Sequence, residues 1–240
     1  MRAEFLKLRA MPTPFWCGIA VITLFVVGLA VTFVWGAGND QDSLALIAFP
    51  TAICSIVLGV WIFGVEYGQN TLRRTVAADP DRVRLIVAKL AVVLAVVIAV
   101  TVLLYLLALP LYGLANNGHS FDFPTDGVLR VGADAIFTNV SYVLVGAALA
   151  LITSSMAGGM TAALVFIFVI DGMLSLIPKV GDYTFGLAMA DVSSAITGTD
   201  IGGFGEGAGH SAGIGLLIVV AWVVLLLALG SQRLTSSDIK

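Results

Sequence analysis

The feature that most constrains this chain is a series of long apolar stretches, of which the clearest runs from Leu90 to Leu109 without a charged residue. A helix needs about 20 apolar residues to cross the hydrocarbon core of a bilayer. Six stretches qualify: residues 15–36, 44–64, 88–112, 132–153, 159–177 and 211–230. With 59% hydrophobic and 11% charged residues, a soluble fold could not cover its surface with polar groups. The sequence therefore predicts an all-α integral membrane protein with six transmembrane helices, forming one domain over residues 1–240.

A short amphipathic helix is predicted ahead of the first span, over residues 1–11. Met1, Phe5 and Leu8 share one helical face, and basic residues occupy the remainder. Pro12 and Pro14 then break the helix. Such a segment lies in the membrane interface with its bases toward lipid phosphates. The alternative is a plain basic start signal that only orients the chain.

The basic residues indicate which way the chain crosses the membrane, because cytoplasmic loops carry an excess of lysine and arginine. Arg130 and Lys179 fall on one side of a six-helix topology. The other ten of the 12 basic residues fall on the opposite side: Arg2, Lys7, Arg9, Arg73, Arg74, Arg82, Arg84, Lys89, Arg233 and Lys240. Both termini are therefore expected in the cytoplasm of a multi-pass protein of the plasma membrane, which we expect to be bacterial.

The remaining polar residues exclude several functions. The net charge of −3 argues against a nucleic-acid partner. His119 and His210 fall on the outer side, where no spacing of ligands indicates a metal site, so both are expected to be solvated loop residues. Cys17 and Cys54 lie in different spans at depths that differ by roughly 10–15 Å, which is too far for a disulfide. Both are expected to be small buried residues.

The connection between the second and third spans, residues 65–87, is short, polar and strongly basic. With Lys89 it holds five of the 12 basic residues. Asp79 suits the N-cap of a helix that begins at Pro80, so the segment is predicted to form two helices with a break between them. The alternative is an ordinary loop whose bases only fix orientation.

This connection resembles that of the permease subunits of type-2 ABC exporters. The resemblance rests on the string Glu66-Tyr67-Gly68-Gln69-Asn70-Thr71-Leu72-Arg73-Arg74, followed by Pro80-Asp81-Arg82 and then by Ala88-Lys89 at the mouth of a span. It extends to the amino-terminal helix, the six spans and a long outer loop before the last span. Two departures from the family pattern are Asn70, where glycine is usual, and Ala78-Asp79-Pro80, where Ser-x-Pro is common.

The resemblance implies a permease that exports a small molecule, drug, lipid or peptide. Its basic connection would couple to a dimer of separate ATPase subunits through Glu66, Gln69, Thr71, Leu72, Arg73, Arg74, Pro80 and Arg82. A second permease chain, identical or paralogous, would complete the pathway in the lipid bilayer. This chain has no G-x-x-x-x-G-K-[ST] phosphate loop, so it is not expected to be an enzyme or to bind ATP or another cofactor itself.

Two further features lie toward the outer side. Residues 178–210 form a long predicted loop, in which Phe185 to Ile196 are apolar enough for a short helix. Asp171 lies inside the fifth span, where a carboxylate is costly, so it is expected either to line a substrate pathway or to make a structural hydrogen bond. A secondary transporter or channel, and a membrane enzyme, remain alternatives. The first predicts charges along several spans and the second a cluster of catalytic side chains at one depth.

Overall fold

The computed structural model describes residues 40–69, 82–115, 125–198 and 207–236, together with Ile19, Thr23, Val26 and Val27. Within these ranges every regular element is a helix. The elements are α3 (Asp40–Gly68), α5 (Arg82–Ala115), α6 (Thr125–Thr153), α7 (Met156–Val165), the π-helix η1 (Phe166–Ile170), α8 (Asp171–Ser175), the 3-10 helix η2 (Gly181–Tyr183), α9 (Phe185–Thr197) and α10 (Ala212–Ser236). The predicted all-helical fold is confirmed for this part of the chain.

Five helical segments in the described residues are long and apolar enough to cross a membrane. They are Thr51–Gly68, Arg84–Leu106, Leu129–Thr153, Met156–Ser175 and Ala212–Arg233. Each overlaps one of the last five predicted spans. The first predicted span, residues 15–36, lies outside the described residues except at four positions, and the predicted interfacial helix, residues 1–11, lies wholly outside them. A sixth span and the orientation of the chain remain predictions.

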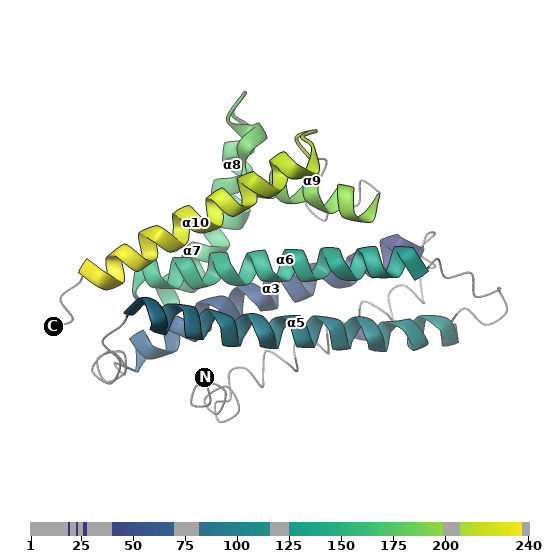
Figure 1. Ribbon diagram of the computed structural model, residues 1–240, viewed down its shortest axis with the longest axis horizontal. Coiled ribbons are helices and arrows are strands. Elements are labelled where there is room, and N and C mark those ends of the chain that lie inside the picture. The colour runs from purple at the N-terminus through teal and green to yellow at the C-terminus, as the bar shows by residue number, and fades with distance from the viewer. Residues whose placement is uncertain are drawn as a thin grey trace.

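Helix α6 is the centre of the bundle. It packs against α3, α5, α7, α9 and α10, and its contact with α3 is the most extensive in the described part. Figure 1 shows α3, α5 and α6 running lengthwise beside one another, α3 behind the other two, with α10 crossing at an angle above them and α8 pointing away. Of the α6 span 67% is buried, compared with 22% of the α10 span. Helix α10 therefore offers most of its surface to lipid or to a partner.

Small residues allow α3 and α6 to approach until their backbones touch. A β-carbon added to Gly59 would overlap the carbonyl oxygen of Val143, and one added to Gly146 would lie 2.5 Å from that of Ile56. Lipid tails are as apolar as leucine, so helices associate in a membrane through close packing. The sequence contained this signal in the spacing of Gly146 and Ala150, which is typical of tightly packed membrane helices.

A turn of two residues joins α6 to α7 and reverses the chain. Ser154 adopts a left-handed conformation with φ of 51°, and Ser155 is the N-cap of α7. The Gly158 N–H donates to Ser155 Oγ over 3.3 Å, which satisfies one of the free amides at the start of a helix. The fourth and fifth predicted spans therefore form a tight helical hairpin.

The long predicted loop before the last span contains packed structure. The predicted short helix is confirmed as α9, and the ring of Phe185 at its start is 1% exposed. Its ring centroid lies 5.9 Å from that of Tyr142 on α6 and 6.1 Å from that of Phe166 in η1. Trp222 Nε1 on α10 donates to the Tyr183 carbonyl over 3.0 Å. The start of α9 and the short segment before it therefore contact three spans.

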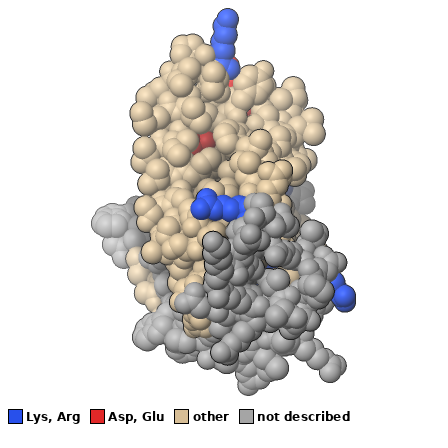
Figure 2. All heavy atoms as spheres, turned by 90° about the vertical axis from the view of Figure 1, so that its left-hand side faces the viewer, with Lys and Arg blue, Asp and Glu red and all other residues tan. Residues whose placement is uncertain are grey.

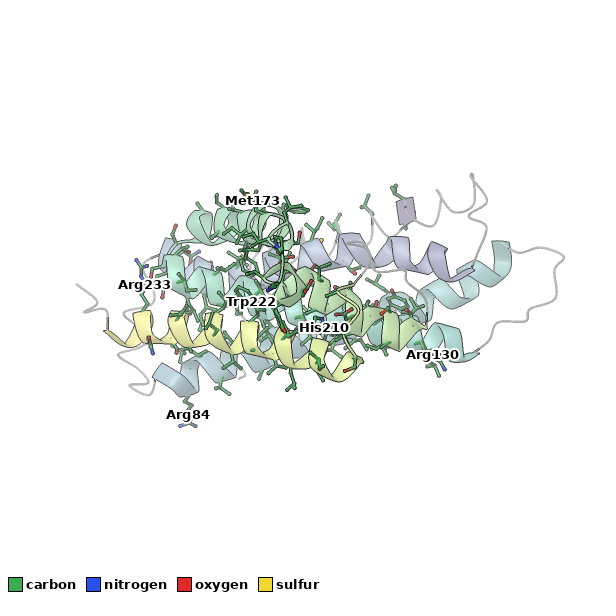
Figure 3. All side chains as sticks on the ribbon, turned by 90° about the horizontal axis from the view of Figure 1, so that it is seen from above. Arg84, Arg130, Met173, His210, Trp222 and Arg233 are labelled. Carbon is green, nitrogen blue, oxygen red and sulfur yellow. The ribbon has the colours of Figure 1, made fainter. Side chains whose placement is uncertain are left out.

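Charged side chains are sparse on the described surface. Figure 2 views the molecule from the side on which α5 begins and α10 ends, and shows isolated basic and acidic groups on an otherwise uncharged described surface. Figure 3 shows Arg84 and Arg233 toward this end and Arg130 toward the other. We call the end with Arg84 and Arg233 the basic end.

Candidate functional site

At the basic end, a buried ion pair joins the two helices that flank the basic connection. Glu66 lies in the last turn of α3, and Lys89 lies two turns into α5. Lys89 Nζ is 2.7 Å from Glu66 Oε1, and the two side chains are 1% and 0% exposed. The ammonium group also lies 5.7 Å from the centroid of the Phe63 ring, a distance suited to cation–π attraction.

The other residues predicted to couple to an ATPase lie beyond this pair. Gln69 is exposed just after the end of α3, and Arg82 is the first residue of α5. The remaining predicted residues, Thr71, Leu72, Arg73, Arg74 and Pro80, lie outside the described residues. The structure thus brings Glu66 together with Lys89 and buries both side chains, whereas contact with an ATPase stays a prediction for the other seven residues.

Asp171 stands at a change of helical type in the fifth span. The five preceding residues form η1, and the Asp171 N–H donates to the Phe166 carbonyl. Asp171 Oδ2 accepts a hydrogen bond from the Gly186 N–H over 2.9 Å. Gly186 lies in the first turn of α9, where amides lack partners within the helix, so the carboxylate holds α9 by its N-terminus. A contact with cargo is untested, and the structural hydrogen bond that the sequence left open is present.

Two further carboxylates hold the same helix, and sequence reasoning missed both. Asp134 on α6 is 8% exposed and accepts a hydrogen bond from Ser193 Oγ. Asp191 is 4% exposed and accepts from the N–H groups of Gly209 and His210 over 2.9 and 3.3 Å, just before α10 begins. The available signal was the presence of the charged residue Asp191, with Ser193 beside it, inside a mainly apolar short helix.

His210 is more enclosed than a solvated loop residue. Its Nδ1 lies 3.5 Å from Asp191 Oδ2, and its ring centroid lies 5.4 Å from that of Tyr183. His210 is a loop residue, as predicted, but only 21% of its side chain is exposed, because Asp191 and Tyr183 pack against it. His119 lies outside the described residues, and among those described no group of three or more His, Cys, Asp or Glu could hold a metal ion.

A polar cluster joins three spans within the bundle. Asn139 Nδ2 on α6 donates to Thr101 Oγ1 on α5 over 3.0 Å and to Thr51 Oγ1 on α3 over 3.3 Å. Asn139 also borders a cavity of about 20 Å³, large enough for one water molecule. Its lining residues are Thr51, Cys54, Ser55, Leu58, Val97, Val100, Thr101, Leu104 and Asn139. Cys54 is a buried free thiol there, as the sequence predicts.

Five span-length apolar helices around a packed core define a multi-pass helical membrane protein. A family model described as ABC-2 family transporter protein matches residues 1–171, which is most of the chain. This chain belongs to that family and is a membrane component of an ABC transporter. No curated protein matches the sequence closely enough to serve as a relative.

Proposed function

We propose that this chain is the permease subunit of an ATP-driven exporter of the bacterial plasma membrane, working with a separate ATPase dimer and a second permease chain. Family membership supports a transport role, and the exporter resemblance of the basic connection supports the direction of transport. The cargo is a small molecule, drug, lipid or peptide that crosses between two such chains.

The observation that carries the proposal is the construction of the connection between α3 and α5. A buried ion pair fixes the ends of the two helices, and the residues between Gln69 and Arg82 include two adjacent arginines. Cations at this density can meet acidic groups of a soluble partner, and complementary charge favours correct docking. Movement of a partner held there would act directly on two spans.

The proposal is tested by isolating the tagged chain in mild detergent from cells of its source and measuring vanadate-sensitive ATP hydrolysis in the purified fraction. The wild-type chain is expected to carry this activity, and Arg73→Glu with Arg74→Glu is expected to lose it. Arg233→Glu with Lys240→Glu is the matched control, because it reverses two charges in the carboxyl-terminal region and leaves the connection intact. Equal activity in both double variants would refute docking at the connection.

A secondary transporter or channel gives a different result. Transport in vesicles would then continue without ATP, and no ATPase activity would accompany the purified chain. The buried charges in the described residues do not favour this alternative, because Glu66 pairs with Lys89 and the carboxylates of Asp134 and Asp171 are held by α9.

A further inference from the structure

The buried ion pair Glu66–Lys89 occupies a mechanically distinctive place. It joins the final turn of α3 to the early part of α5, so it closes the base of the connection that contains residues 70–81. Both side chains are enclosed by the protein, with exposures of 0% and 1%. Their position below the surface means that neither is available to contact a soluble partner.

The rest of the packing does not bind these two helices tightly to each other. Helix α3 makes its main contact with α6, where Gly59 and Gly146 let the backbones touch. The contact between α3 and α5 is much smaller, and α5 also rests mainly on α6. A force applied to the connection could therefore separate the ends of α3 and α5 unless a local bond resisted it.

An ion pair holds two helix ends in one relative position better than an apolar contact does. Removing two charges from water is costly, and one charge left without its partner in a buried site is strongly destabilising. Separating Glu66 from Lys89 would expose each to that penalty, whereas two apolar side chains could slide past each other at little cost. The pair thus favours one relative position of the two helix ends.

We propose that Glu66 and Lys89 are positioning residues that make the ends of α3 and α5 move as one unit when a partner ATPase displaces the connection. This inference rests on the proposed function, and it assigns to Glu66 a role inside the bundle rather than on the docking surface. Phe63 supports the pair by holding the ammonium group of Lys89 over its ring.

The test measures the distance between the two helix ends in the complex of this chain with its co-purified ATPase, reconstituted in lipid nanodiscs. Spin labels are placed at Gln69 and Val87, which are both exposed, after Cys17 and Cys54 are changed to alanine. Distances are recorded without nucleotide and after trapping with ATP and vanadate. In the labelled chain that keeps Glu66 and Lys89, we expect one narrow distance between the two labels, which nucleotide leaves unchanged.

Three variants separate the possible roles of the pair. Glu66→Gln is expected to lose the single distance and to show a further change when ATP and vanadate are added. Glu66→Lys with Lys89→Glu is expected to restore the narrow, unchanged distance. Arg84→Met is the matched control, because it removes an exposed cation from the same helix, and it is expected to behave as the wild type.

Each contrary result has a distinct meaning. The inference would be overturned if Glu66→Gln kept the wild-type distance both without nucleotide and after trapping with ATP and vanadate. It would also be overturned if the distance broadened but nucleotide did not alter it, because the pair would then only stabilise the resting structure. If Glu66→Gln fails to fold, Glu66→Gln with Lys89→Met buries no unpaired charge and must show the same nucleotide-dependent change, or the inference is wrong. A wild-type preparation without ATPase activity would instead overturn the proposed function, and this role with it.

Discussion

Replacing Asp171 by leucine should release the N-terminus of α9 from the fifth span. The carboxylate accepts the Gly186 N–H over 2.9 Å, and the N-cap residue of α9, Thr184, makes no side-chain capping hydrogen bond of its own. A hydrogen bond to a charged group contributes about 1.5–3 kcal/mol. Because each 1.4 kcal/mol changes an equilibrium tenfold, local opening of α9 should increase roughly 10- to 100-fold in Asp171→Leu. Asp171→Asn keeps an acceptor oxygen and should change the opening equilibrium much less.

Amide hydrogen exchange followed by mass spectrometry measures this opening, because exchange of a protected amide reports the free energy of local unfolding. Peptides that cover Phe185–Thr197 should exchange faster in Asp171→Leu, while peptides from α6 should stay protected. Asp182→Leu is the control, since it makes the same replacement at an exposed position four residues from Gly186. Wild-type exchange in α9 of Asp171→Leu, or an equal effect of Asp182→Leu, would refute the reasoning.

Three further predictions concern packing, the polar cluster and orientation. Gly146→Ala should lower the thermal unfolding midpoint in detergent, because overpacking costs about 1–3 kcal/mol of stability. Gly172→Ala should leave the midpoint unchanged, because a β-carbon added there meets nothing within 4 Å. Equal midpoints for the two variants would argue against backbone contact between α3 and α6. Asn139→Asp should destabilise the bundle more than Asn139→Leu, since it adds a buried charge, and the reverse order of midpoints would contradict this. In intact cells, cysteines at positions 41 and 200 should react with an impermeant maleimide and one at position 75 should not; labelling at 75 would overturn the predicted topology.

The last five spans could be predicted because hydropathy alone marks a segment that fits the bilayer. Their ends could not. Helix α3 continues to Gly68 and α5 begins at Arg82, beyond the predicted limits of residues 64 and 88. A helix does not stop where its apolar residues stop, because backbone hydrogen bonding continues into the polar region. The polar connection of residues 65–87 is therefore helical up to Gly68 and again from Arg82, in agreement with the two helices that its sequence predicts.

Some residues of the candidate site could be singled out from the sequence, but their contacts could not. A carboxylate at Asp171 signals a partner, yet that partner, the amide of Gly186, lies on a separate helix whose docking depends on Phe185 and the rings around it. Glu66 and Lys89 were both visible at the borders of the connection. Their pairing requires the relative rotation of α3 and α5, which hydropathy does not contain.

The winding of the π-helix η1 decides the direction in which the side chain of Asp171 points. A π-helical turn takes up more residues than an α-helical turn, and each α-helical residue advances about 100° around the axis. If Phe166–Ile170 wound as an α-helix instead, each of these residues would advance farther around the axis, so Asp171 would face a different direction from Gly186, while Gly159 would keep its close approach to Ala150. The part of this span before η1 therefore packs against α6, and the part after η1 contacts α9. The π-helical turn sets the rotation of one part relative to the other.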